Sequence, residues 1–273
     1  MGRHNLEYPK NVHNTVKRYN HQADYSLRTI HTIINTSPIL HVSFNPPSSP
    51  FPVILPLIGQ MGSFSHPSAD LSSPLDIYLH GYVSSRIMNL SRSSTGSEPP
   101  GLPVCVAASK VDGIVLTLTP NSHNYNYRSA VLFGYASLVE DVEEKLYAME
   151  LITNSVVPDR WRNSRVPPNA AEMSSTQILR VKIESGSAKV REGVPTDERG
   201  DLEDDAVTSR VWTGVVPMYE VLGDPVPGPY NRIEGIPEHV SEWRERVNGE
   251  GREYALEAAE KDAPVPGKKR VGV

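Results

Sequence analysis

Proline restricts the folding of this chain more than any other residue, because it breaks helices and the central strands of sheets alike. The chain has 273 residues, and 24 of them are proline. The prolines cluster at 46–56, 99–103 and 217–229. This distribution argues against a long helical bundle and favours short strands joined by loops.

Apolar runs and alternations between these clusters predict the strands. We expect strands at 39–44, 51–58, 75–80, 104–109, 114–119, 130–139, 177–184 and 211–216. Asp112-Gly113 between two of them is a strong signal for a hairpin turn. Gly134 interrupts a run that is apolar on both faces, which predicts a bulge or the close approach of another backbone.

The apolar period changes to that of a helix in other segments. We expect helices at 24–35 with Asp24 as the cap, from Ser84 or Ser85 to Leu90, and at 140–155, 238–247 and 253–262. In the helix at 140–155, Val142, Leu146 and Met149 align on one face. The order of elements is not a strict alternation of strand and helix, so we predict a mainly β fold, a small antiparallel barrel with satellite helices.

Charge and cysteine content exclude several classes of protein. Lys and Arg number 27 and Asp and Glu number 32, a formal net charge of −5, so we expect no binding to nucleic acid or to membrane surfaces. Cys105 is the only cysteine, which excludes an intrachain disulfide and suits a reducing compartment. The polar first residues and the lack of a long apolar run predict a cytoplasmic protein without a secretory signal or a membrane span.

The common motifs of nucleotide binding and hydrolysis are absent from the sequence. There is no dinucleotide or P-loop glycine motif, no G-x-S-x-G elbow and no H-E-x-x-H. The nine histidines are scattered. We therefore expect no metal site and no hydrolytic chemistry carried by protein side chains alone.

Residues 76–86 are the most informative stretch. A predicted strand ends at Gly81, and Ser84, Ser85 and Arg86 then open a short helix. Backbone N–H groups at a helix start, hydroxyl donors and a guanidinium are the groups that bind a phosphate. On the residues alone, a serine-capped helix with an exposed arginine is the favoured interpretation, because such helix starts are common.

Other candidates stay ambiguous on the residues alone. Arg128 precedes the long strand and can reach an anion or form an ion pair at the strand end. Lys189 and Arg191 either approach a ligand or lie in a solvated turn. Trp212 either covers a planar ligand or packs in a core or interface. His41 and His80 lie on strands, where a partly buried histidine is more common than a general base or ligand.

Nine motifs, in order along the chain, resemble those of the pyridoxamine-5′-phosphate-oxidase-like, FMN-binding split-barrel proteins. The similarity is greatest to their flavin-nucleotide-binding branch, which is similar to the nitroimidazole-resistance proteins. The motifs are ILHVSF at 39–44, PVILPL at 52–57, IYLHG at 77–81 with Ser85-Arg86, PVCV at 103–106, VDGIV at 111–115, NYRSAVLFG at 126–134, VPDRW at 157–161, SAKVREG at 187–193 and WTGV at 212–215.

The resemblance implies a six-stranded antiparallel split barrel that works as a homodimer, with FMN between the two chains. Carried over by motif, the cofactor contacts divide into a phosphate corner, a ring-lining strand and residues at strand ends. The corner is Ser85 and Arg86 on a turn shaped by His80 and Gly81, the lining is Val53, Pro56 and Leu57, and the strand-end residues are Tyr127, Arg128, Lys189 and Arg191, with Trp212 at the border. We expect a polar arm at 1–22, the barrel domain at 23–220, and a proline-rich segment with peripheral helices at 221–273.

These features favour an FMN-dependent oxidoreductase that acts on a small organic substrate. Lys189 or Arg191 near the ring would stabilise the reduced anionic flavin. The alternative is a non-catalytic flavin or haem carrier or sensor, with His80 or His41 as axial ligand. A tailoring enzyme for a specialised metabolite is a third reading. The Trp-x-x-x-Arg-Leu-type ending of true pyridoxamine-phosphate oxidases is missing, so the resemblance does not imply their activity.

Overall fold

The computed structural model describes residues 6–47, 49–94 and 96–264, which divide into two compact units. The first unit comprises residues up to Arg18, 23–109 and 129–188, and the second comprises 19–22, 110–128 and residues from Lys189 onward. Three long strands contribute residues to both units. The domain bounds that we expect from the sequence stay a prediction.

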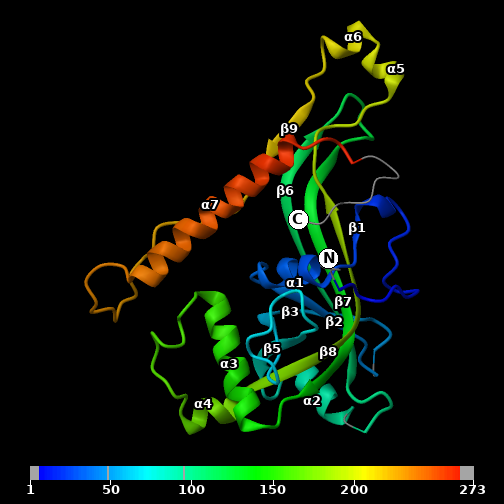
Figure 1. Ribbon diagram of the computed structural model, residues 1–273. Helices are drawn as coiled ribbons and strands as arrows, with labels where there is room; N and C mark the ends of the chain where they lie inside the picture. Colours follow the sequence, from blue (N-terminus) through cyan, green and yellow to red (C-terminus); the bar gives the residue numbers. More distant parts are fainter. Residues whose placement is uncertain (1–5, 48, 95, 265–273) are drawn as a thin grey trace, which may run out of the picture. The chain divides into compact units, whose positions relative to one another are not determined.

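The described residues form a mainly antiparallel set of strands (Figure 1). These are β1 (Ala23–Asp24), β2 (Leu40–Phe44), β3 (Val53–Leu57), β4 (Gly59–Gly62), β5 (Asp76–Tyr82), β6 (Leu102–Leu116), β7 (Asn124–Leu138), β8 (Thr176–Arg191) and β9 (Gly214–Pro217).

Helices surround or follow these strands. They are the short 3-10 turn η1 (Asn20–Gln22) and α1 (Leu27–Asn35), α2 (Arg86–Ser93), α3 (Val142–Val156), α4 (Ala170–Ser175), α5 (Arg199–Leu202), α6 (Asp205–Thr208) and α7 (Glu238–Glu260). The acidic stretch at 197–205 contains α5 and the start of α6. Within the described ranges, no helix has both the length and the hydropathy that crossing a bilayer requires.

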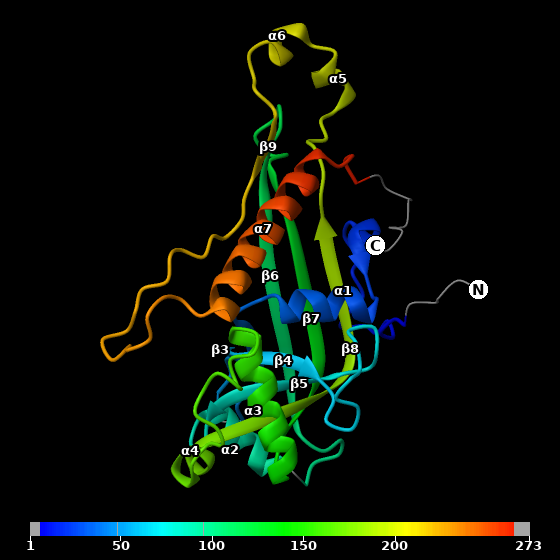
Figure 2. The same ribbon diagram turned by 60° about the vertical axis from the view of Figure 1, so that its left-hand side comes forward.

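The strands of the barrel follow the path β3-β2-β6-β7-β8-β5-β4, with the larger part of β6, β7 and β8 in the first unit (Figure 2). β3 and β4 are consecutive pieces of one extended stretch that is interrupted at Ile58. β3 pairs with β2, β4 pairs with β5, and the His80 amide donates to the Ile58 carbonyl at 2.9 Å. The two ends of the path are therefore adjacent in the chain, and the path has six strands if β3 and β4 count as one. The predicted six-stranded split barrel with satellite helices is confirmed.

Alternation of side chains sets the inner and outer faces of the barrel wall. Leu40, Val42 and Phe44 of β2 are buried, whereas His41 between them is exposed. The register pairs Leu40 with Leu57 on the inner face and His41 with Pro56 on the outer face. This is the period-2 pattern of a strand with one side on the core.

The first helix and the polar arm before it pack on the same unit. Leu27, Ile30 and Ile34, at the helical spacing i, i+3 and i+7, form the buried stripe of α1. The helix begins at Leu27 and not at Asp24, because the Asp24 carboxylate accepts from the Ser26 amide at 2.7 Å and holds the chain extended there. The arm is docked by Tyr8, whose amide donates to a backbone carbonyl at 2.9 Å and whose side chain is buried.

The predicted hairpin at Asp112-Gly113 is wrong, because β6 continues through both residues. The Asp112 side chain is buried and accepts two hydrogen bonds from the Arg128 guanidinium, at 2.9 and 2.6 Å. Gly113 pairs with β9, and a Cβ on it would lie only 2.9 Å from a methyl group of Val215. Partners from elsewhere in the chain thus hold these two residues in an extended conformation, although Asp-Gly by itself favours a turn. By contrast, the predicted close approach at Gly134 is confirmed, since a side chain there would collide with the Lys182 carbonyl oxygen.

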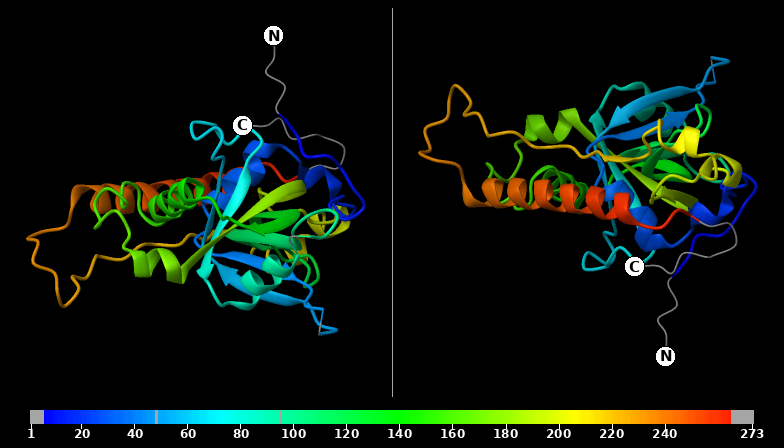
Figure 3. Two further views of the ribbon diagram at one scale, coloured as in Figure 1. Left: turned by 90° about the horizontal axis from the view of Figure 1, so that it is seen from below. Right: turned by 90° about the horizontal axis from the view of Figure 1, so that it is seen from above.

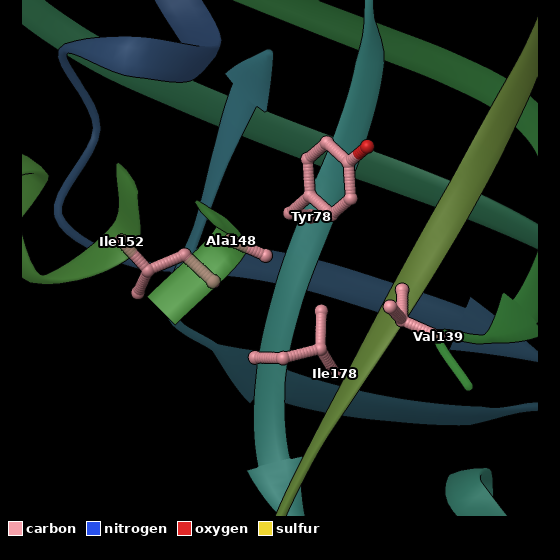
Figure 4. Close-up of a cluster of buried hydrophobic side chains, with 5 residues drawn as sticks. All are labelled: Tyr78, Val139, Ala148, Ile152 and Ile178. Carbon is pink, nitrogen blue, oxygen red and sulfur yellow. The ribbon is translucent and has the colours of Figure 1, made fainter. Parts of the chain in front are cut away.

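The predicted apolar stripe of α3 is only partly correct, because Met149 packs against the core whereas Val142 is exposed. The buried residues of this helix are Glu144, Ala148 and Ile152. Figure 4 shows Ala148 and Ile152 beside Tyr78 of β5, in a cluster that includes Val139 and Ile178. Glu144 can face inward because its carboxylate accepts from the Tyr78 hydroxyl at 2.8 Å and from the Arg180 guanidinium at 2.9 Å.

In the second unit, one helix of 23 residues replaces the two that we expect at 238–247 and 253–262. The Asn-Gly-Glu-Gly stretch at 248–251 predicts a break, but Asn248 is held from outside the helix. Its side chain accepts from the Leu222 amide at 2.8 Å and donates to the Leu222 carbonyl at 3.0 Å. Near the other end, the Gly193 amide donates to the Ala258 carbonyl at 2.7 Å, so both halves of α7 are fixed.

Candidate functional site

A sharp corner forms where β5 ends and α2 begins. The Ser85 amide donates to the Tyr82 carbonyl at 2.9 Å, and Ser85 is the N-cap residue of α2. A Cβ on Gly81 would lie 2.6 Å from the terminal methyl of Met88, which is fully buried. Glycine at 81 therefore lets the first turn of α2 pack directly against the end of the strand.

Several donors at this corner have no acceptor. The Ser85 Oγ is buried, and none of the residues that the structure describes hydrogen-bonds to it; it makes no capping bond to the helix. The amides of Arg86, Ile87 and Met88 are in the first turn, where a helix supplies no acceptor. Arg86 is exposed, and no described carboxylate lies within ion-pair distance of it. A hydroxyl, helix N–H groups and an unpaired guanidinium together are suited to an anion.

The end of β3 lies next to this corner. The bond from the His80 amide to the Ile58 carbonyl joins β5 to the residue that follows β3. His80 and Tyr82 alternate with Gly81 and share one face of β5; both are exposed, Tyr82 by 63%. On β3, Pro56 is exposed and Leu57 is half-buried. Pro56 on the outer face of β3, with His80 and Tyr82, thus forms an apolar and aromatic strip that leads to the β5–α2 corner.

His80 is exposed, but neighbouring atoms enclose part of its ring. This partial burial lowers the pKa of His80 below the usual value for an imidazole and favours the neutral ring. A neutral ring beside the strip can contact an apolar or aromatic ligand without the cost of burying a cation.

Of the seven predicted residues in the first unit, His80, Gly81, Ser85 and Arg86 lie at the β5–α2 corner, and Val53, Pro56 and Leu57 lie along β3. Their contact with a cofactor stays a prediction. Sequence reasoning did not select Tyr82 or Ile58. Tyr82 could have been predicted from the sequence, because side chains two residues apart on a strand lie on the same face as His80. Ile58 could have been predicted because it directly follows the strand at Val53–Leu57.

The other five predicted residues belong to the second unit, and both arginines among them are hydrogen-bonded to other residues. Arg128 forms the bidentate pair with Asp112, and its guanidinium lies 3.6 Å from the centre of the Tyr254 ring. Arg191 is buried and donates to the Asn126 side chain and, at 3.3 Å, to the Gly193 carbonyl. For Arg128 the structure shows the strand-end ion pair that the sequence leaves as an alternative.

The remaining three are accessible to different degrees. Trp212 is 65% exposed, Tyr127 is half-buried, and the Lys189 ammonium lies 5.3 Å from the centre of the Tyr19 ring. Contact of these side chains with a cofactor stays a prediction. In the described part of the chain, no group of three or more His, Cys, Asp or Glu side chains is placed to hold a metal ion.

Two solved structures resemble this chain over most of its length. The flavocytochrome Anf3 from Azotobacter vinelandii is 26% identical, with a TM-score of 0.67 over 86% of this chain and 97% of that one. A protein from Mycobacterium smegmatis described as binding FAD and haem is 23% identical, with a TM-score of 0.66 over 82% and 97%. The second likeness shows the fold alone.

A search of curated proteins finds no match. The family described as pyridoxamine 5′-phosphate oxidase matches residues 26–190, which is more than half of the chain and includes the β5–α2 corner and all of the barrel path except the last residue of β8. This chain therefore belongs to the pyridoxamine 5′-phosphate oxidase family.

Proposed function

We propose that this protein binds a flavin nucleotide, with a phosphate of the cofactor at the β5–α2 corner. One observation carries the proposal. The buried Ser85 Oγ lacks a partner beside an unpaired Arg86, at a helix start whose first N–H groups are also free. An unsatisfied buried hydroxyl costs free energy, and a phosphate oxygen would remove that cost.

The flavin ring would lie along the strip from β3 to Tyr82. Val53, Pro56 and Leu57 offer apolar atoms and backbone groups, and Tyr82 and neutral His80 offer aromatic surface. We predict FMN, as the family resemblance implies. The Mycobacterium smegmatis neighbour is described as binding FAD, so the experiment must identify the nucleotide that is bound.

We further propose an oxidoreductase that acts on a small organic substrate and works as a homodimer. The bound flavin would supply the electron transfer. The chain would bind and orient the flavin and the substrate, and it would exclude water from the site. Lys189 is then the candidate cation for the electron-rich edge of the ring, because Arg191 is buried and bonded to Asn126. The sequence has no nucleophile-base motif, which agrees with a reaction whose chemistry is carried by the flavin and not by protein side chains.

A second candidate function is haem binding in addition to flavin binding. It is favoured by the similarity to a flavocytochrome, at 26% identity and a TM-score of 0.67. His41 and His80 are both exposed on the barrel and are the candidate axial ligands. A Soret band in the purified or haem-reconstituted protein, lost in His41→Ala or His80→Ala, would support it.

The test of flavin binding is the absorbance of the purified or reconstituted protein, with the released nucleotide identified by chromatography. We expect a flavin spectrum and about 10- to 100-fold weaker binding in Arg86→Gln, from the loss of a charge-assisted hydrogen bond. Ser85→Ala should weaken binding less. Arg92→Gln, in the last turn of the same helix, is the matched control. Failure of the folded protein to take up FMN or FAD would refute the proposal.

A further inference from the structure

Arg191, at the end of β8, is a buried cation without a counter-charge. The residue is 6% exposed, and among the residues that the structure describes no carboxylate lies within ion-pair distance of its guanidinium. The neighbouring Glu192 is engaged elsewhere, since its carboxylate accepts from the Tyr254 hydroxyl at 2.5 Å and lies 3.2 Å from the Lys261 ammonium. A buried charge is normally paired, because burial removes the hydration that stabilises it.

A second arginine of the same unit shows the ordinary arrangement. Arg128 donates two hydrogen bonds to Asp112, at 2.9 and 2.6 Å. Burial disfavours this cation, but the bonds and the charge of Asp112 outweigh the burial and raise the pKa of Arg128. Burial lowers the pKa of Arg191, and only the nearby Tyr127 opposes that shift. The fold therefore balances one of these two charges and not the other.

The Arg191 guanidinium keeps one edge for a ligand. Nη1 donates to the Asn126 side chain and, at 3.3 Å, to the Gly193 carbonyl. Nη2 has one contact with the Val194 carbonyl, at 3.5 Å, which is the limit of hydrogen-bond length, and Nε has no partner among the described residues. Nε is also not one of the fully buried atoms that lack a partner, so it keeps contact with solvent. Nε and Nη2 together form an edge that can bind a carboxylate through two parallel hydrogen bonds.

Asn126 and the last turns of α7 hold this guanidinium in place. The Asn126 side chain is fully buried, and its amide nitrogen donates to the carbonyls of Gly193 and Ala258, both at 3.2 Å. These bonds orient the amide, so that its oxygen accepts from Nη1. The Gly193 amide also donates to the Ala258 carbonyl, at 2.7 Å, in the part of α7 that is drawn in red in Figure 3. A group that is fixed before the ligand arrives loses less entropy on binding.

The backbone around Arg191 does not cancel its charge. The end of a helix carries a partial negative charge equivalent to about half an elementary charge. At the end of α7, the carbonyls of Ala258 and Lys261 already accept hydrogen bonds from other groups. Lys189, two residues before Arg191, places a second cation on the same face of β8. The end of this strand is therefore positively charged beside the open edge of the guanidinium.

We propose that Arg191 binds a carboxylate of a small organic ligand through Nε and Nη2, at a site built from other residues than the β5–α2 corner. A carboxylate fits because its two oxygens match the two donors of a guanidinium edge. The bound carboxylate supplies the missing counter-charge and so stabilises the folded protein. The inference does not rest on flavin binding, since every group that carries it belongs to the second unit.

The test is urea unfolding of the flavin-free full-length protein at pH 7.5, with sodium acetate, sodium benzoate or sodium phosphate added. A ligand that binds only the folded state lowers the unfolding equilibrium constant about 11-fold at ten times its Kd. We expect this effect of acetate or benzoate in wild type and not in Arg191→Gln, which keeps an N–H donor for Asn126 but has no charge. General effects of salt act on both proteins and cancel in the comparison.

Two control variants separate this site from other cations. Arg210→Gln, at an exposed arginine of the same unit, should respond to the carboxylates as wild type does. Arg86→Gln should also respond, because the corner is not the site of this binding. Loss of the response in Arg86→Gln would place the carboxylate at the corner and contradict the inference.

A second comparison needs no added ligand. Arg191→Gln should change the unfolding equilibrium constant by less than about tenfold, because it removes a charge that has no partner. Arg128→Gln leaves Asp112 buried without its partner and should raise that constant about 100-fold or more. The inference is overturned by an equal carboxylate response in wild type and Arg191→Gln, by protection from phosphate alone, or by equal losses in the two arginine variants. Flavin uptake is read separately from absorbance, so failure of the proposed function is distinguished from failure of this inference.

Discussion

Acid should destabilise this protein through one buried histidine, His31 of α1. The side chain is fully buried, with the Tyr8 hydroxyl 2.7 Å from Nε2 and the Leu71 carbonyl 2.9 Å from Nδ1. The carbonyl can only accept, so Nδ1 carries the proton and Nε2 accepts from Tyr8. This arrangement fits the neutral ring.

The magnitude follows from the pKa of this group in the two states. Burial lowers the pKa of His31 to about 4, from about 6.5 in the unfolded chain. Below pH 6.5 the unfolded chain binds a proton that the folded protein does not, so stability falls as pH decreases from 6.5 towards 4. The slope is about 1.4 kcal/mol per pH unit, and the loss is about 2 kcal/mol by pH 5.

The assay is urea unfolding of wild type and His31→Gln at pH 7.5 and pH 5. Other titrating groups contribute to both proteins and largely cancel in the comparison. Wild type should lose about 2 kcal/mol more than the variant over this interval. His66→Gln, at an exposed histidine, should behave as wild type. If the variant folds poorly, titration of the His31 ring in wild type by NMR gives the same answer. Equal losses in both proteins, or a ring that titrates near pH 6.5, would refute the reasoning.

Two further predictions concern packing. Gly134→Ala should lower the free energy of unfolding by about 1–3 kcal/mol, measured by urea denaturation, because the added methyl meets the Lys182 carbonyl and not a movable side chain. Unchanged stability would mean that β7 and β8 are further apart there. Glu144→Gln should cost about 1–3 kcal/mol by removing the charged acceptor of Arg180. A double-mutant cycle with Tyr78→Phe should show coupling, whereas additive losses would argue against the shared carboxylate.

The candidate site could be found in the sequence where its residues are contiguous. Ser85 and Arg86 follow a strand and a glycine, so the local order alone places a hydroxyl and a guanidinium at a helix start. Sequence could not show that the Ser85 Oγ lacks a partner, because that depends on every group around it. It also could not decide for Arg128 between a ligand and an ion pair, since Asp112 comes from another strand.

The sequence by itself determined those elements that depend mainly on the pattern of side chains within their own segment. The alternation in β2, the stripe of α1 and the backbone contact at Gly134 follow from residues within each segment, and the family motifs follow the same order. Tertiary structure decided the cases in which a distant group reverses a local preference. Asp112-Gly113 stays extended because Arg128 and β9 hold it, α3 turns Glu144 inward because Tyr78 and Arg180 satisfy its charge, and α7 is continuous because Leu222 bonds Asn248. The physical reason is common to all three, because a buried or bonded polar group is stable only with its partner, and the partner is far away in the chain.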